Sequence, residues 1–239
     1  MGAQWKHAGQ QSNASKRGAL FSKLVKEIIV SAKMGDPNPD NNFRLRAALE
    51  VARRMSVPRE TIERGIKKGA GLLEPVNYET VVYEGFAPHN VALIVECLTD
   101  NKNRTAADIR VLFRKGQLGS IGAVTWMFDR LGVIEATHAS SGLDIEGSAI
   151  EAGAQNVEAL ESTEIPAGHT GARFFCEATD LAVVTKALVD AGWTVTTTEL
   201  SFIAKNSTEL SPEQKKEVTE FLGAIDDNDD VHRIYAALK

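Results

Sequence analysis

Hydrophobic positions recur every three or four residues through the first third of the chain, as they do along the buried face of an α-helix. This spacing predicts three helices, over residues 17–34, about 41–55 and 58–69. Asp40 or Asn41 is expected to cap the second helix, Pro58 suits the first turn of the third, and Gly69 would stop it. The first third is therefore predicted to form a small helical bundle.

The polar faces of these helices carry much of the positive charge of the chain. Residues 1–75 hold fourteen Lys and Arg against seven Asp and Glu, whereas residues 76–239 hold thirteen against twenty-five. The net charges of +7 and −12 sum to the −5 of the whole chain. On the first helix, Lys16, Lys23, Lys26 and Lys33 are expected to face the solvent. A basic module on an acidic body is typical of a protein that binds a polyanion and stays soluble.

Beyond residue 77 the period of the pattern shortens to two, which is typical of β-strands. Strands are predicted at 78–86, 91–99 and 123–128, with a helix over 105–115. The next elements follow the β-α-β-β-α-β order of ferredoxin-like folds, at residues 133–137, 143–152, 156–160, 172–178, 181–191 and 194–203. A helix over 211–222 and a strand over 230–235 come last, and we expect them to return to the short middle section.

These elements predict an α+β protein of three domains. A basic helical domain would cover residues 1–75, and a ferredoxin-like α/β domain would cover residues 131–205. The second would be inserted into a discontinuous α/β domain made of residues 76–130 plus 206–239. No apolar run reaches the roughly 18 residues of a membrane span and no signal or transit peptide is recognisable, so the expected location is the cytoplasm.

The sequence contains no recognisable motif for a catalytic site, a metal site or a cofactor site. Cys97 and Cys176 stand in apolar strand-like runs, which favours buried structural thiols. The five histidines lack metal-ligand spacing, and no Ser/His/Asp or Cys/His arrangement has a catalytic context. We therefore expect no enzymatic activity, no metal and no cofactor, and we interpret Glu84 and Glu96 as ordinary strand residues.

Three polar segments outside the helical part are candidate sites. In segment 100–105, short side chains can cap a helix, whereas Arg104 is better suited to hold a phosphate. The glycine-rich segment 116–122 lacks the Lys-Ser/Thr of a nucleotide P-loop and is expected to be a flexible connection. Segment 226–230 fails the EF-hand pattern at two required positions, which leaves a solvated turn or an acidic patch for the basic helices or a basic partner.

Several blocks together carry a family signature. They are Lys16-Arg17-Gly18, Phe21-Ser22-Lys23-Leu24, Asn42-Phe43-Arg44-Leu45-Arg46, Ile62-Glu63-Arg64-Gly65-Ile66-Lys67-Lys68-Gly69, Tyr83-Glu84-Gly85-Phe86, Asp100-Asn101-Lys102-Asn103-Arg104-Thr105 and Asp229-Asp230-Val231. They closely resemble the YebC/PmpR family almost end to end, and the block at 100–105 is the most specific. Trp5-Lys6-His7 also agree, but residues 8–13 replace the strongly basic run of that family.

The resemblance implies a cytoplasmic protein of three domains without catalytic residues or cofactor. Members are usually described as DNA-binding transcriptional regulators. Others, mitochondrial relatives among them, resemble translational activators that act at the ribosome.

We expect nucleic acid to contact this chain through its phosphates, because no base-reading helix is recognisable. The candidate cations are Lys16, Arg17, Lys23, Lys26, Arg44, Arg46, Arg53, Arg54, Arg59, Arg64, Lys67, Lys68 and Arg104. A DNA-binding transcriptional regulator is the first hypothesis. Two others stay open: a translation factor that contacts ribosomal RNA or tRNA, and an interaction scaffold whose acidic segment Asp226–Asp230 recruits a protein.

Overall fold

The computed structural model describes residues 14–74, 77–160 and 165–238. The N-terminal segment 5–13, in which residues 8–13 replace the basic run of the YebC/PmpR family, lies outside them. The fold is α+β, as predicted, and the chain divides into two compact units. The first unit comprises residues 1–129 and 202–239, and the second comprises residues 130–201. The division into three domains stays a prediction.

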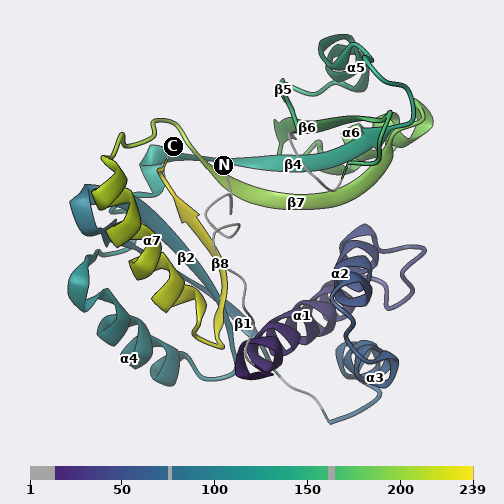
Figure 1. Cartoon of the computed structure of the whole chain (residues 1–239). Coiled ribbons are helices and arrows are strands. Elements are labelled where there is room, and N and C mark those ends of the chain that lie inside the picture. Colours follow the sequence, from purple (N-terminus) through teal and green to yellow (C-terminus); the bar gives the residue numbers. More distant parts are fainter. Residues whose placement is uncertain (1–13, 75–76, 161–164, 239) are drawn as a thin grey trace. The chain divides into compact units, whose positions relative to one another are not determined.

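Three helices open the first unit: α1 (Ala14–Met34), α2 (Phe43–Arg54) and α3 (Arg59–Gly69) (Figure 1). They share one core, which contains Ile28, Ala32, Leu45, Ala48, Leu49, Ala52, Val57 and Ile62. Most of these are the positions that helical spacing predicted, because each helix buries the side chains that recur on one face. Helix α3 ends at Gly69, but the left-handed residue that terminates it is Gly71, with φ of 75°.

The cap of α2 is Asn42, and the expectation of Asp40 or Asn41 is wrong. Asn42 Oδ1 accepts the backbone N–H of Leu45 at 3.0 Å. Its Nδ2 donates to two backbone carbonyls in and after the last turn of α1, each at 2.9 Å. Because Asn42 is buried between the helices, one amide begins α2 and also holds the end of α1, which the exposed residues before it cannot do.

The rest of the first unit is an antiparallel sheet with strand order β3-β1-β2-β8. Its strands are β1 (Glu79–Ala87), β2 (Val91–Thr99), β3 (Gln117–Leu118) and β8 (Val231–Ala236). Helices α4 (Lys102–Leu112) and α7 (Pro212–Asp226) cover one face, where Ile109 and Leu222 pack with β2 in a shared core (Figure 1). The C-terminal helix and strand thus return to the middle section of the chain.

The strand predicted at 123–128 is wrong. Residues 120–127 form a turn and a short 3₁₀-helix, and strand β4 begins only at Phe128. The carboxylate of Glu84 accepts three backbone N–H groups at 2.8–2.9 Å, from residues 122, 124 and 125. These bonds hold the segment in a turn, so the interpretation of Glu84 as an ordinary strand residue is also wrong. The glycine-rich segment before it contains β3 and is more than a flexible connection.

The second unit has the predicted β-α-β-β-α-β order. Its elements are β4 (Phe128–His138), α5 (Ile145–Ala152), β5 (Asn156–Ala159), β6 (Thr170–Glu177), α6 (Leu181–Asp190) and β7 (Thr194–Ala204), of which β4 and β7 extend slightly beyond the unit. The strand order β5-β6-β4-β7 places the first strand of the motif between its third and fourth, as in ferredoxin-like folds. Both helices pack on one core around Ile134, Phe174 and Leu188.

Both cysteines are buried free thiols, as predicted. Burial raises the pKa of Cys97 to about 12 and that of Cys176 to about 11, so neither thiol is a ready nucleophile. Within the described residues, no helix combines the length and the apolar character that crossing a membrane requires.

Candidate nucleic-acid interface

The two central lysines of α1 do not face the solvent, and that prediction is wrong. Lys23 Nζ donates to the backbone carbonyl of Asp226 and lies 3.4 Å from its carboxylate. Lys26 Nζ lies 2.7 Å from Asp230 Oδ1 and donates to the carbonyls of Asp229 at 2.9 Å and Leu98 at 3.3 Å. The side chains of Lys23 and Lys26 are only 14% and 13% exposed. Both ammonium groups therefore bind the end of α7 and the segment that leads from it to β8.

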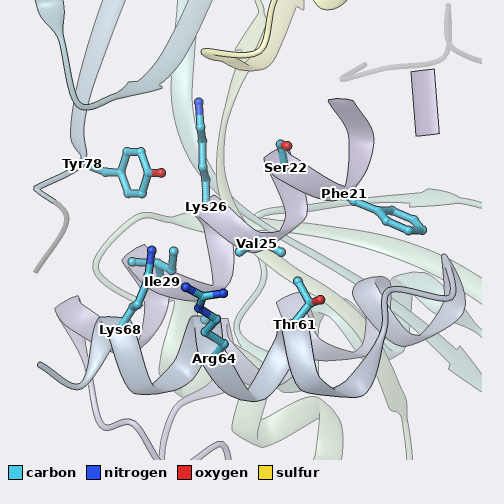
Figure 2. A pocket seen from close by; sticks show the side chains of 10 residues that line it. Phe21, Ser22, Val25, Lys26, Ile29, Thr61, Arg64, Lys68 and Tyr78 are labelled. Atoms are coloured by element: carbon cyan, nitrogen blue, oxygen red, sulfur yellow. The ribbon is translucent and has the colours of Figure 1, made fainter. Parts of the chain in front are cut away.

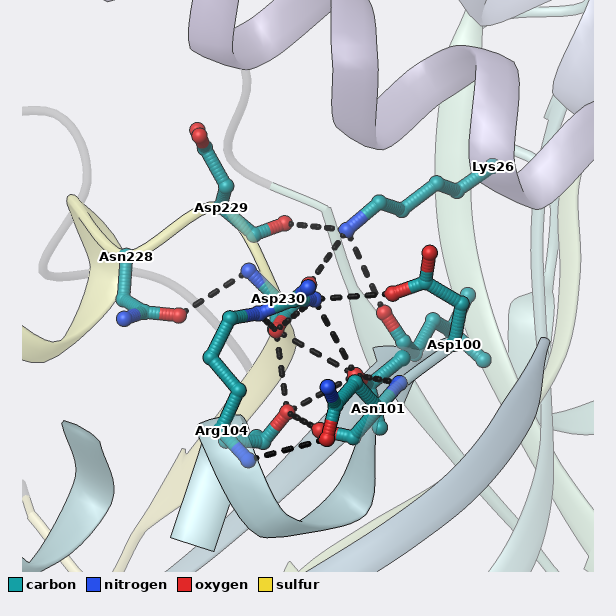
Figure 3. Close-up of polar contacts among 10 residues, drawn as sticks. Lys26, Asp100, Asn101, Arg104, Asn228, Asp229 and Asp230 are labelled. Carbon is teal, nitrogen blue, oxygen red and sulfur yellow. Dashed lines mark hydrogen bonds and ion pairs between the residues drawn. The ribbon is translucent and has the colours of Figure 1, made fainter. Parts of the chain in front are cut away.

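Asp230 is the centre of this polar network, which we call the Asp230 cluster and which also includes Lys26, Thr99, Arg104 and Thr105 (Figure 3). Its Oδ2 accepts from Arg104 Nη2 at 2.8 Å, from Thr105 Oγ1 at 2.9 Å and from Thr99 Oγ1 at 3.2 Å. Burial raises the pKa of Asp230, but the bonds from Lys26, Arg104 and Thr105 outweigh it and lower that pKa to about 2. The carboxylate therefore stays charged and bonded at neutral pH.

The Asp230 cluster changes the interpretation of two sequence segments. Arg104 pairs with Asp230 and, at 2.8 Å, with Asp100, so the Nε and Nη2 groups of its guanidinium are bonded to two carboxylates, although the side chain is 48% exposed. Asn101 caps α4 by accepting the backbone N–H of Arg104 at 3.1 Å, as the capping interpretation of this segment predicted. Segment 226–230 is not simply a solvated turn, because Asp226 and Asp230 contact the lysines of α1.

Other cations of the helices also have internal partners. Arg44 Nε lies 2.7 Å from Glu27 Oε1, and His232 Nε2 of β8 lies 3.0 Å from Glu27 Oε2. Burial raises the pKa of Glu27, but the close approach of His232 and the hydrogen bonds from Arg44 hold that pKa well below its usual range. Arg46 donates to two backbone carbonyls of the α1–α2 connection, and Arg59 pairs with Glu63 at 2.8 Å across one turn of α3.

Four candidates differ from these. Among the residues that the structure describes, none forms a hydrogen bond or ion pair with Arg53, Arg64, Lys67 or Lys68. Arg53, Arg64 and Lys67 are exposed and Lys68 is half-buried. We call these four residues the α2–α3 cations. Arg54 is exposed but has a partner, and Lys16 and Arg17 lie in the first turn of α1.

Three of the α2–α3 cations, Arg53, Arg64 and Lys68, line two depressions of the helical part. Arg53 lines one of them, of about 440 Å³, beside Arg59 and Glu63 of α3. Arg64 and Lys68 line the other, of about 450 Å³, which lies between α1, α3 and Tyr78 (Figure 2). We call it the Tyr78 pocket; its lining is Phe21, Ser22, Val25, Lys26, Ile29, Thr61, Arg64, Gly65, Lys68 and Tyr78, without a carboxylate.

The sequence patterns missed Glu27, Tyr78 and His232. Glu27 gives a usable signal, because it precedes the buried Ile28 on a helix whose other charges are all positive, Lys16, Arg17, Lys23, Lys26 and Lys33. A lone acid at such a place needs a cationic partner. Tyr78 and His232 give no local signal, because their roles depend on residues that are distant along the chain.

Family comparisons cover nearly the whole chain. Residues 3–72 match the family model described as the TACO1/YebC protein N-terminal domain, and residues 78–238 match that of the TACO1/YebC second and third domain.

Matches to individual relatives also cover nearly the whole length of both chains. A protein of Bdellovibrio bacteriovorus is 50% identical over 241 residues, with all of both chains covered. One of Pseudomonas savastanoi pv. phaseolicola is 51% identical over 240 residues, which cover 100% of this chain and 99% of the relative. Both are named "probable transcriptional regulatory protein". The crystal structure of a conserved hypothetical protein from Aquifex aeolicus superposes with a TM-score of 0.78 at 36% identity, covering 99% of this chain and 96% of that one.

Proposed function

Because this chain belongs to the TACO1/YebC family, we propose that it is a nucleic-acid-binding regulatory protein, and specifically a transcriptional regulator that contacts DNA phosphates through its α2–α3 cations. The observation that carries the proposal is the absence of any described hydrogen-bond or ion-pair partner for Arg53, Arg64, Lys67 and Lys68. The names of the relatives support a regulatory role.

The candidate cations fall into two groups, those with and those without a hydrogen-bond or ion-pair partner among the described residues. A phosphate can replace water at a solvated cation, but at Lys26, whose side chain is only 13% exposed, it would have to displace the buried carboxylate of Asp230. The α2–α3 cations carry no such cost. Each cation that neutralises a phosphate releases condensed counterions, so this surface supports binding that weakens steeply with salt.

The proposed contact reads phosphates and not bases. Contacts to phosphates position a protein on a duplex without carrying sequence information. We therefore expect a weak preference between DNA sequences, and the choice of target in the cell then depends on a second surface or partner.

The test compares two variants with the same loss of charge. In the interface variant, Arg53→Gln, Arg64→Gln and Lys67→Gln remove three α2–α3 cations. The control variant carries Arg110→Gln, Lys115→Gln and Lys186→Gln, at exposed positions outside the helical bundle. Affinity for a random-sequence DNA duplex is measured as a function of salt concentration.

The interface variant is expected to bind more weakly and with a shallower salt dependence, by about 0.9 in the slope of log affinity against log salt for each lost phosphate contact. The control is expected to retain the slope of the wild type. Equal losses in both variants would show that only net charge matters, and would contradict the proposal. Parallel titrations with duplex and ribosomal RNA test the translation hypothesis, which a consistent preference for RNA would favour.

A further inference from the structure

We propose that the Tyr78 pocket binds one unpaired nucleoside phosphate, with the phosphate on Arg64 and Lys68 and the base against Tyr78 and the apolar floor. This inference rests on the proposed function, in which the cations of α3 bind phosphate, and it names the form of nucleic acid that fits the site. A single strand or a free nucleotide can supply that chemistry.

The charge of the pocket suits a phosphate. Arg64 and Lys68 stand four residues apart, so they lie on the same face of α3, and Figure 2 shows both side chains projecting from that helix. None of the ten lining residues is acidic. Lys26 also lines the pocket, but Asp230 neutralises it, which leaves Arg64 and Lys68 as the cations for an anion.

The remainder of the lining suits a base. Val25 and Ile29 of α1 provide apolar surface, and Ser22 and Thr61 provide hydroxyl groups that can donate or accept hydrogen bonds. The volume of about 450 Å³ is within the range of about 300–1,000 Å³ that is usual for small-molecule sites. An apolar floor with a few polar groups at one side matches an aromatic base attached to a charged phosphate.

Tyr78 lies at the edge of the pocket beside a lysine that is itself fixed. Lys26 Nζ lies 5.6 Å from the centre of its ring, and the Asp230 cluster fixes that ammonium group. Burial, followed by the charges of Asp100 and Asp230, raises the pKa of Tyr78, so its hydroxyl remains a neutral donor at physiological pH. The ring is therefore an uncharged aromatic surface in the pocket lining on which a base can pack.

Only an unpaired nucleotide can use the pocket in this way. In a duplex, stacking and pairing keep the base away from a surface that contacts the phosphates. A base in a single strand can instead pack on an aromatic side chain while cations hold the backbone. The pocket thus predicts base-dependent affinity for single strands in addition to the phosphate-dependent affinity for duplexes.

The experiment uses the full chain and two probes, a single-stranded 12-mer and a strand of the same length without bases. Wild-type protein is expected to bind the normal strand at least about fivefold more tightly, as stacking of one base provides. Tyr78→Ala is expected to remove this difference and to leave duplex affinity unchanged, whereas Tyr78→Phe retains the ring and the difference. If the wild-type protein binds both strands equally, that result alone overturns the inference, and no variant needs to be measured.

Further arms separate this inference from the proposed function. If the Arg53→Gln, Arg64→Gln, Lys67→Gln variant loses duplex binding but Tyr78→Ala changes neither strand, the pocket assignment fails and the proposed function stands. If that triple variant binds every probe as the wild type does, the proposed function fails. Adenosine 5′-monophosphate that binds as tightly as the 12-mer would identify a free nucleotide as the occupant, and weaker binding would identify a strand.

Discussion

Asp230 joins segments that are far apart in the chain. Its carboxylate binds Lys26 of α1, Arg104 and Thr105 of α4 and Thr99 of β2, while it is only 4% exposed. Removing one member of a buried ion pair lowers stability strongly, because the other charged group is left buried without its counter-charge. Replacing Lys26 or Arg104 would therefore report on folding as much as on nucleic acid.

Asp230→Asn is expected to lower the free energy of unfolding by about 3–5 kcal/mol at neutral pH, because Lys26 and Arg104 lose their buried counter-charge. Urea denaturation measures the change. Asp227→Asn is the matched control, since Asp227 is exposed three residues away and should change stability by less than about 0.5 kcal/mol. A variant as stable as the control would contradict the role of Asp230.

The same comparison has a defined pH dependence. The pKa of Asp230 is lowered to about 2 in the folded chain, against about 3.9 for an unperturbed Asp. A depressed folded pKa stabilises the protein above the unfolded value, and this contribution disappears as pH falls through the folded value. The stability difference between wild type and Asp230→Asn is thus expected to be complete above about pH 4 and to shrink between about pH 4 and 2.

At the scale of elements, Glu84 of β1 shapes the segment that leads into β4. Burial raises the pKa of Glu84, but hydrogen bonds from Thr125, Gly122 and Val124 outweigh it and lower that pKa. The segment that these bonds organise exposes Ile121 and Trp126, which are 94% and 69% exposed. The carboxylate of Glu84 on β1 accepts the backbone N–H groups of this segment, which in a β-strand would bond to the backbone of a neighbouring strand.

Glu84→Gln is expected to lower stability by about 1–3 kcal/mol, because an amide cannot accept all three backbone bonds. The more specific readout is hydrogen exchange, in which the amides of Gly122, Val124 and Thr125 should exchange faster while those of β2 remain protected. Glu79→Gln is the control, because Glu79 pairs with Lys102 at the exposed end of the same strand. Unchanged exchange at the three amides would show that the turn forms without Glu84.

At the scale of the whole molecule, the two units differ in continuity. The core of the second unit, with Ile134, Phe174 and Leu188, comes from one stretch of chain. The core of the sheet in the first unit obtains Leu222 of α7 and Ile234 of β8 from the C-terminal segment. Folding of this core therefore requires the middle section and the C-terminal segment of the chain to come together.

Residues 130–205 expressed alone are expected to unfold in one cooperative thermal transition. Residues 76–130 alone should show no such transition, because the side chains of α7 and β8 that fill their core are missing. Circular dichroism during heating distinguishes the two results. Joining residues 206–239 to residues 76–130 is the control, since it should restore a transition; a cooperative transition of 76–130 alone would contradict the discontinuous unit.

Local patterns predicted most elements of this protein. The strand at Val91–Thr99 follows from the spacing of neighbouring residues, and the capping of α4 by Asn101 follows from their type. The strand predicted at 123–128 failed because its conformation depends on Glu84, which lies about forty positions earlier in the chain. Periodicity records which face of an element is apolar, but it does not record which distant side chain binds its backbone.

The sequence by itself determined the order of the elements, the ferredoxin-like motif and the concentration of positive charge in the first third, because each of these is a local or additive property. Only the tertiary structure decided which cations remain available for a phosphate. Lys26 and Asp230 are 204 positions apart, and Lys26 has the same chemistry in the sequence as Lys67. Folding distinguishes them, because the buried ammonium group of Lys26 requires a carboxylate partner, whereas that of Lys67 stays in water.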